Sequence, residues 1–295
     1  MDATLALIGF GEAGSTFAKA AGWEAGALAY DINPARRAVM EEAGVVACAT
    51  AECALTSADF ALSLVTADSA LPAARDYAGL LKPGAIWCDM NSVAPDTKRA
   101  AAKAIEAAGG RYVDVAVLAP VHPARMNVPL LLAGEAAARA EALLREAGFA
   151  NVRIVGAEIG RASAIKMIRS IMVKGIEALT AEMMLAASAA GVVDEVLASL
   201  DASEKRESWT VRAAYNVERM TTHGIRRAAE MEESCKTLES LGIEPVMTSG
   251  TVRRQREQAG KAIPFASSEV EMPSAGVSTS LDTNGGRVGI GVTSE

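Results

Sequence analysis

A glycine-rich loop near the N-terminus constrains the fold more than any other feature of this sequence. The loop reads Gly9-Phe10-Gly11-Glu12-Ala13-Gly14, follows a short apolar segment at 3–9 and opens a segment of helical spacing at 12–22. In a strand-loop-helix context, the first glycine permits a tight turn, the second lets the backbone approach a diphosphate, and the third allows close helix packing. We therefore expect a dinucleotide to bind at residues 9–14, against the helix N-terminus.

The remaining sequence up to residue 156 alternates between strand-like and helix-like segments. Apolar strand patterns recur at 26–31, 58–66, 84–89, 111–117, 129–134 and 151–156. Helical patterns lie at 34–43, 69–81, 94–108 and 135–147. Alternation of this kind predicts parallel βαβ units. We therefore predict an α/β fold, with a Rossmann-type doubly wound parallel sheet over residues 1–157.

Strand signals end at about residue 158. One helical pattern runs from there to about Gly191, and further helices are expected at 194–200, 203–222 and 224–241, with Gly224 and Gly242 as breaks. Residues 158–262 thus predict an all-α second domain. Residues 263–295 are rich in Ser, Gly and Thr without periodicity, which indicates a tail or a docked arm.

Composition excludes several classes of protein. The 295 residues are 51% hydrophobic, which is enough to bury a full core. A net charge of −7 without a compact basic run argues against nucleic acid and against a membrane surface as partner. The two histidines and four cysteines lack zinc-ligand spacing, so no metal is expected. Because no signal peptide or apolar span is evident, we expect a cytoplasmic protein.

An acidic residue follows the second strand pattern. Asp31 ends the segment GALAYD, where a carboxylate can accept hydrogen bonds from the adenosine ribose and would repel a 2′-phosphate. NAD is therefore the favoured cofactor. Arg36 and Arg37 lie just beyond and can reach such a phosphate, so NADP stays possible. Thr66, at the end of the 58–66 strand pattern, is a further expected cofactor contact.

These motifs resemble those of the β-hydroxyacid dehydrogenase superfamily, which includes 3-hydroxyisobutyrate, tartronate semialdehyde and 6-phosphogluconate dehydrogenases. The resemblance covers roughly residues 3–240 and rests on GFGEAG at 9–14, DMNSVAP at 89–95, VDVAVLAP at 113–120 and IGRASAIKMIRS at 159–170. It implies a nicotinamide-dependent oxidation of a small hydroxy acid, or the reverse reduction, between the two domains. It also implies a homodimer formed through the helices, and a long apolar helix supports this expectation.

The resemblance assigns Lys166 as the catalytic residue. Family members carry a lysine six residues after a glycine at the start of the long helix, and Gly160 and Lys166 keep this spacing. Hydride delivery to a carbonyl builds alkoxide charge, which an ammonium group can stabilise and protonate. A partly dry cleft that lowers the pKa of the lysine would suit both directions of the reaction. The alternative is a solvated helix lysine.

Four polar residues are candidate substrate contacts. Arg169 stands where the family usually has Asn or His, and it shares a helical face with Lys166 and Ser170. Its guanidinium suits a carboxylate or phosphate, although a surface ion pair is the alternative. Asn91 and Ser92 replace the family's Ser-Thr, and we assign both to the substrate and Ser92 also to the cofactor. Capping of the following helix is the alternative for both residues.

The sequence departs most from the family at Leu118-Ala119-Pro120. Family members usually have Ser-Gly-Gly there, which binds the substrate carboxylate, whereas proline has no N–H group to donate. We therefore expect a larger or less polar substrate than 3-hydroxyisobutyrate or tartronate semialdehyde. His122 follows and is a candidate substrate contact, although a lone histidine is more often packed than functional.

The predicted function is that of an NAD(P)-dependent dehydrogenase or reductase acting on a hydroxy acid or a related alcohol or carbonyl compound. Two alternatives remain open. One is an imine reductase, which shares the two-domain architecture. The other is a regulatory protein that keeps the dinucleotide loop and Asp31 but has lost turnover.

Overall fold

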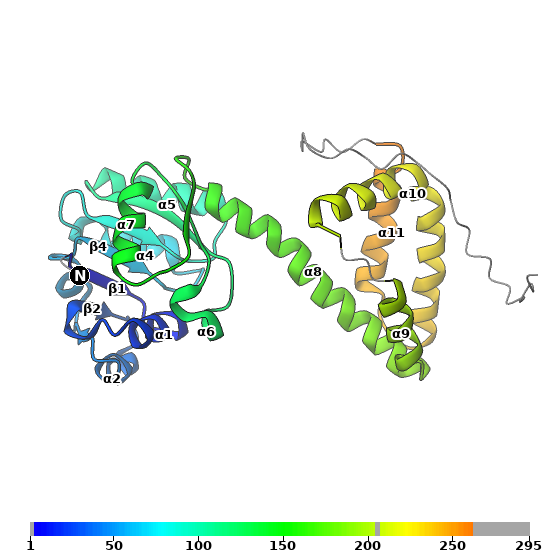
Figure 1. Ribbon diagram of the computed structural model, residues 1–295, viewed down its shortest axis with the longest axis horizontal. Coiled ribbons are helices and arrows are strands. Elements are labelled where there is room, and N and C mark those ends of the chain that lie inside the picture. Colours follow the sequence, from blue (N-terminus) through cyan, green and yellow to red (C-terminus); the bar gives the residue numbers. More distant parts are fainter. Residues whose placement is uncertain (1–2, 204–206, 262–295) are drawn as a thin grey trace, which may run out of the picture. The chain divides into compact units, whose positions relative to one another are not determined.

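The computed structural model describes residues 3–203 and 207–261 and divides the chain into two compact units, Met1–Gly175 and Ile176–Glu295 (Figure 1). Helix α8 (Arg161–Ala190) begins in the first unit and continues into the second. The predicted domain boundary at 157 and 158 stands just before this helix. The predicted tail at 263–295 lies outside the described residues. Within the described residues, every helix is too short or too polar to cross a membrane.

The first unit is built on an eight-stranded sheet in the order β3-β2-β1-β4-β5-β6-β7-β8. The strands are β1 Leu5–Ile8, β2 Ala27–Tyr30, β3 Val46–Ala47, β4 Phe60–Ser63, β5 Ile86–Asp89, β6 Arg111–Val117, β7 Leu130–Ala133 and β8 Val152–Gly156. The helices are α1 Glu12–Ala21, α2 Arg37–Glu42, α3 Ala51–Leu55, α4 Ala70–Tyr77, α5 Pro95–Ala107, α6 Val121–Ala124 and α7 Ala137–Glu146. This arrangement confirms the predicted α/β class and Rossmann-type domain.

Three details of the first unit differ from the sequence prediction. Strands β6 and β7 are antiparallel. The connection between them holds only the four-residue α6 and a short 3₁₀ turn, whereas parallel strands are usually joined by a longer crossover helix. Strand β3 and helix α3 had no clear sequence signal. They have two and five residues, which is too short for a periodic pattern to show.

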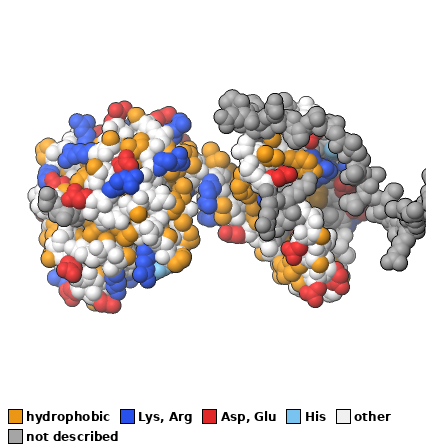
Figure 2. All heavy atoms as spheres, viewed as in Figure 1, with side chains coloured by type: hydrophobic (Ala, Val, Ile, Leu, Met, Phe, Trp, Pro, Cys, Tyr) orange, Lys and Arg blue, Asp and Glu red, His pale blue; other side chains and the backbone are white. Residues whose placement is uncertain are grey.

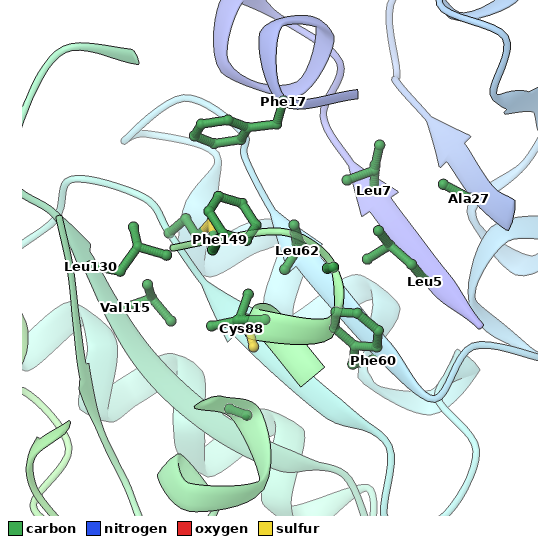
Figure 3. Close-up of a cluster of buried hydrophobic side chains, with 14 of the residues drawn as sticks. Leu5, Leu7, Phe17, Ala27, Phe60, Leu62, Cys88, Val115, Leu130 and Phe149 are labelled. Atoms are coloured by element: carbon green, nitrogen blue, oxygen red, sulfur yellow. The ribbon is translucent and has the colours of Figure 1, made fainter. Parts of the chain in front are cut away.

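Aromatic packing fixes α1, and with it the glycine loop, on the sheet. Phe17 of α1 meets Phe149 edge to face, with ring centroids 5.1 Å apart, and both rings point into the apolar cluster shown in Figure 3. Trp23, just after α1, donates its indole N–H to the carbonyl oxygen of Ala147. Burial of each phenylalanine stabilises the fold by about 1.5–3 kcal/mol. The N-terminus of α1 is therefore held at the carboxyl end of β1.

The described part of the second unit is entirely helical, as predicted. It contains the second half of α8, α9 (Val193–Ser203), α10 (Trp209–Ser240) and α11 (Val246–Gln258). Glu182 of α8 accepts backbone N–H groups from Met247 at 2.7 Å and Thr248 at 2.9 Å, in the first turn of α11. A carboxylate at a helix N-terminus is stabilising, so this contact anchors α11 to α8.

The predicted break at Gly224 is wrong, because α10 runs without interruption from Trp209 to Ser240. Gly224 is buried where α10 lies beside α11 (Figure 1). A Cβ atom at this position would clash with the carbonyl oxygen of Gln255 and crowd Ala259. The glycine therefore serves the close approach of two helices and does not end one.

Acidic and basic side chains are intermixed on the face of the first unit that Figure 2 shows. Ion pairs in this unit include the exposed pair Lys19–Glu42 at 2.9 Å and the half-buried pair Lys82–Asp59 at 2.6 Å. Exposed pairs of this kind contribute little to stability. The predicted absence of a nucleic-acid partner remains a prediction.

The packing at Gly224 yields a stability test. We expect Gly224→Ala to lower the free energy of unfolding by about 1–3 kcal/mol, because the new methyl group must push α10 from α11. Gly250 of α11 is the matched control, since a Cβ there meets no atom within 4 Å, and Gly250→Ala should be neutral or stabilise by up to about 1 kcal/mol. Urea denaturation followed by circular dichroism measures both. Equal effects of the two substitutions would contradict this account of Gly224.

Candidate active site

A hollow of about 420 Å³ lies in the first unit at the carboxyl ends of the central strands. Its walls come from the start of α1, the segments that follow β4, β5 and β6, and the first turns of α8. Its polar lining side chains are Glu12, Asn91, Ser92 and Lys166, and the rest of the lining is apolar. Ligands of open α/β sheets bind at this edge.

The glycine loop borders this hollow and its three glycines have different surroundings. Gly9 has a φ of +91°, and a Cβ there would meet the carbonyl oxygen of Leu64. A Cβ at Gly14 would meet the carbonyl oxygen of Gly9. A Cβ at Gly11 would meet nothing within 4 Å, and no side chain caps α1 there. The open face over Gly11 and the uncapped N–H groups of α1 fit a diphosphate group.

Asp31 and Arg36 hold the loop from the end of β2. The Asp31 carboxylate accepts the backbone N–H of Phe10 at 2.7 Å and that of Asn33 at 2.8 Å. Arg36 Nε donates to the Phe10 carbonyl oxygen at 2.7 Å. Each oxygen of an ionised carboxylate has a second acceptor site, so Asp31 can still bind a ribose hydroxyl.

A second hollow of about 250 Å³ lies beside Asp31 and is lined by Gly9, Gly11 and Thr66, among other residues. Tyr30 and Tyr77 also line it, and their rings meet edge to face with centroids 6.1 Å apart. This hollow borders the same glycine loop as the larger one. Of the predicted cofactor residues, Gly9, Gly11, Asp31 and Thr66 line this hollow, and Glu12, Ala13 and Ser92 line the larger one. Phe10 and Gly14 are buried and line neither.

Lys166 and Ser92 meet in the larger hollow. Lys166 Nζ donates to Ser92 Oγ at 2.5 Å, which joins α8 to the segment after β5. Burial, together with the positive charges of Lys98 and Lys174, lowers the pKa of Lys166 to about 8. A lysine with this pKa exchanges its proton near neutral pH, which is what a general acid and base needs.

Asn91 is buried, and most of its polar atoms have partners. Its Nδ2 donates to Ser63 Oγ at 2.9 Å and to Asp89 Oδ1 at 2.8 Å. Its Oδ1 is buried without a partner in the described residues, and Asn91 lines the hollow. The N-cap of α5 is Ala94 without a side-chain cap, so neither Asn91 nor Ser92 caps that helix. Asn91 Oδ1 can therefore accept an N–H group from a ligand.

Sequence reasoning missed the buried network beneath this site. Lys98 of α5 is fully buried, and its Nζ lies 2.9 Å from Asp89 Oδ1 and 3.5 Å from Asp114 Oδ1. Tyr112 donates its hydroxyl to Asp89 Oδ2 at 2.6 Å, and burial together with the Asp89 charge raises the pKa of Tyr112. The sequence does place Asp89 and Asp114 next to the apolar residues of two predicted strands, and a buried carboxylate requires a partner.

Asp114 also determines where α8 begins. Its Oδ2 accepts the backbone N–H groups of Gly160 at 3.2 Å and Ser163 at 3.0 Å. Gly160 has a φ of +99°, and a Cβ there would clash with Arg99 and crowd Pro95. The carboxylate thereby caps the first turn of the helix that carries Lys166. The spacing from Gly160 to Lys166 places Nζ over Ser92.

The remaining predicted substrate contacts do not line this hollow. Arg169 Nη1 lies 3.4 Å from the Leu118 carbonyl oxygen and not against an acidic side chain, and Ser170 lies one residue further along α8. His122 lines a separate hollow of about 360 Å³, where its Nε2 lies 3.0 Å from Thr16 Oγ1. The structure therefore brings together Lys166, Ser92 and Asn91.

Among the described residues, no cluster of three metal-ligating side chains is present.

Two parts of the chain match known protein families. Residues 4–156 match the family described as the NAD binding domain of 6-phosphogluconate dehydrogenase. Residues 187–258 match a family described as a domain of unknown function, DUF1932. The first match covers the sheet, the glycine loop and Asp31, and the second lies in the helical unit.

Solved structures resemble the chain over most of its length. A conserved hypothetical protein from Sinorhizobium meliloti 1021 is 37% identical, with 87% of this chain and 88% of that chain covered and a TM-score of 0.59. A conserved protein of unknown function, described as structurally similar to 3-hydroxyacid dehydrogenases, is 29% identical over 86% of this chain and 96% of that chain, with a TM-score of 0.57. The NADP⁺ complex of the imine reductase from Myxococcus stipitatus is 21% identical over 86% of this chain and 93% of that chain, with a TM-score of 0.71. At this identity the imine reductase shows a shared fold alone.

The buried network predicts a large effect of one carboxylate. We expect Asp114→Ala to lower the free energy of unfolding by about 3–5 kcal/mol, because it removes a partner of buried Lys98 and the cap of α8. The control is Asp96→Ala, since Asp96 pairs with Arg99 on the surface, and the expected loss is below about 1 kcal/mol. Chemical denaturation of the two variants and the parent checks this. A small effect of Asp114→Ala would show that the network does not support the fold.

Proposed function

Because the chain belongs to the family that carries the NAD binding domain of 6-phosphogluconate dehydrogenase, we propose that it is an NAD(P)-dependent oxidoreductase. It transfers a hydride between nicotinamide and a hydroxy acid or a related alcohol or carbonyl compound, with Lys166 as the general acid and base. The observation that carries this proposal is the meeting of Lys166 and Ser92 in a hollow that the glycine loop borders.

The residues at the loop support binding of a dinucleotide. The open face over Gly11 and the N–H groups of α1 would hold the diphosphate, and Asp31 would accept the ribose hydroxyls. The negative charge of Asp31 opposes a 2′-phosphate, so NAD is the proposed cofactor and NADP is the alternative. Thr66 lines the hollow beside Asp31 and is a further proposed contact.

The side chains in the larger hollow support the chemistry. Bound nicotinamide supplies or accepts the hydride. Lys166 Nζ donates a proton to the oxygen of a carbonyl substrate during reduction and removes it from the alcohol during oxidation. Ser92 Oγ orients Nζ, and the unpartnered Asn91 Oδ1 accepts an N–H group from the ligand. Because most of the lining is apolar, the charge that develops on the substrate oxygen is stabilised mainly by Lys166.

The segment after β6, which lines the larger hollow, favours a less polar substrate. The Leu118 N–H donates to the Pro129 carbonyl oxygen, the Leu118 carbonyl oxygen faces Arg169, and Pro120 has no N–H. Few donors therefore remain there for a substrate carboxylate. We keep three further residues as predicted substrate contacts, namely Arg169, Ser170 and His122. Because they do not line the larger hollow, they would contact a part of the substrate that extends beyond it.

An imine reductase is a second candidate function. The apolar wall at 117–121 suits an uncharged substrate, and the fold is shared with imine reductases. Lys166 favours the carbonyl or alcohol reaction, because an ammonium group stabilises an oxyanion better than it stabilises an iminium ion. A regulatory protein without turnover is the remaining alternative.

We also propose a homodimer, a small-molecule substrate as partner and a cytoplasmic location. Exposed apolar side chains along α8, including Ile168, Ile171 and Met172, support an interface between two copies of the chain. The predicted absence of a nucleic-acid or membrane partner rests on the net charge of −7.

Calorimetric titration of NADH and NADPH tests the cofactor assignment. We expect NADH to bind the parent protein more tightly than NADPH, and Asp31→Ala to weaken NADH by about tenfold or more, because a charge-assisted hydrogen bond is lost. Asp31→Asn can still accept the Phe10 N–H and should mainly lose the discrimination against NADPH. Asp96→Ala is the surface control. If neither nucleotide binds the parent protein, the oxidoreductase proposal is wrong.

Substitution of Lys166 tests the reaction. We expect Lys166→Met to lower kcat by about 10²–10⁴-fold with little change in dinucleotide affinity. In the parent protein, reduction should slow as pH rises through about 8, since the neutral amine cannot donate a proton, and oxidation should become faster over the same range. Lys174→Met removes a like charge and should move both profiles to higher pH. Full turnover by Lys166→Met would exclude this mechanism.

A further inference from the structure

Two of the four cysteines meet at the edge of the sheet in the first unit. Cys48 follows β3 and Cys53 lies in α3, and their Sγ atoms are 2.6 Å apart. The Cys48 N–H donates to the Ala29 carbonyl oxygen at 2.8 Å, and the Cys53 N–H donates to Thr50 Oγ1 at 3.2 Å. Both backbone positions are thus held by hydrogen bonds, which keep the two sulfur atoms side by side.

The two thiols differ in their access to solvent. Cys48 is only 8% exposed and packs in an apolar cluster with Ala51 and Leu55, whereas Cys53 is exposed. Burial raises the pKa of the Cys48 thiol to about 12, and its contact with Cys53 acts in the same direction. A soluble oxidant therefore reaches Cys53 first, and Cys48 stays a protonated thiol directly beside it.

The other two cysteines have no thiol partner. Cys88 of β5 is fully buried, and burial raises the pKa of its thiol to about 12. Cys235 of α10 has the hydroxyl of Ser249 as its neighbour, 3.7 Å from its Sγ. Cys48 and Cys53 are therefore the pair that can close a disulfide within one chain.

We propose that Cys48 and Cys53 form a reversible oxidation site for hydroperoxides. In the first step the Cys53 sulfur attacks hydrogen peroxide and the O–O bond breaks. One oxygen stays on Cys53 as a sulfenic acid, and the other leaves as water with the thiol proton. In the second step Cys48 Sγ attacks Cys53 Sγ, the S–O bond breaks, and the hydroxyl leaves as water with the Cys48 proton. Two thiols are oxidised to one disulfide, and hydrogen peroxide is reduced to two molecules of water.

The buried Cys48 thiol protects the exposed Cys53 from irreversible oxidation. A sulfenic acid without a neighbouring thiol is open to further oxidation to sulfinic acid, which small thiols do not reverse. Condensation with Cys48 stops Cys53 at the disulfide, and a small thiol then restores both groups by exchange. The oxidation of these two thiols is independent of the proposed oxidoreductase function. The nearest link to it is structural, since β3 pairs with β2, the strand that leads to Asp31.

Peptide mapping of the full chain after peroxide treatment tests the proposal. Residues 38–75 contain both Cys48 and Cys53 and end at Arg75 without an internal Lys or Arg, so trypsin releases both cysteines in one peptide. After brief treatment with hydrogen peroxide and alkylation with N-ethylmaleimide, we expect this peptide to lack both maleimide groups and two hydrogen atoms. Dithiothreitol given before alkylation should restore both labelling sites.

Three variants separate the proposal from nonspecific oxidation. Cys48→Ala should leave Cys53 as a sulfenic acid that a dimedone probe captures and that proceeds to sulfinic acid. Cys53→Ser should leave Cys48 reduced. Cys235→Ser is the control and should form the 38–75 disulfide as the parent does. The proposal is overturned if the parent protein accumulates sulfinic acid at Cys53, joins two chains through Cys53, or keeps both thiols free for labelling.

Discussion

The site depends on the buried ion pairs that the ammonium group of Lys98 forms with two aspartates. This ammonium group lies between Asp89 and Asp114, which are neighbours in the pairing of β5 with β6, and all three side chains are withdrawn from water. Two adjacent carboxylates in a sheet interior would repel each other strongly without a cation, and a buried cation is costly without them. The three groups therefore stabilise one another only together. Asp114 extends their influence to α8, because its second oxygen accepts the first backbone N–H groups of that helix.

This arrangement connects the stability of the sheet with the chemistry of the hollow. Asn91 is held by Asp89 and Ser63, and its remaining oxygen is left for a ligand. Lys166 is placed by the start of α8, and the charge of Lys98 helps to lower its pKa toward neutrality. A polar network below an apolar pocket thus sets both the position and the protonation of Lys166, the proposed general acid and base. Interactions of this kind are stronger in a low-dielectric interior than in water.

Most of the glycines discussed above lie where a side chain would collide with neighbouring protein atoms. Gly9 and Gly14 permit the loop to fold on itself and on Leu64, Gly160 lets α8 begin against α5, and Gly224 brings α10 to α11. Gly11 differs, because no protein atom would obstruct a side chain there. Its lack of a side chain is therefore not explained by packing within the protein, and it fits the proposed approach of a dinucleotide to the backbone. In the sequence Gly224 resembles a helix break, because Gln255, the residue of α11 that a side chain there would meet, is 31 residues further along the chain.

The resemblance to a known family supplied the candidate lysine. Local pattern was sufficient to predict most strands and helices of the first unit, the dinucleotide loop with Asp31 and the helical nature of the second unit. Each of these features depends on residues a few positions apart, and strand and helix periodicity or the spacing of glycines reports them directly. Only the tertiary structure decided that β7 runs antiparallel to β6, that Lys98 pairs with Asp89 and Asp114, and that Cys48 meets Cys53. It also separated His122 from the hollow that Lys166 lines. The physical reason is that burial and charge pairing join residues from different strands and helices, and the free energy of such a contact depends on which groups the fold removes from water together.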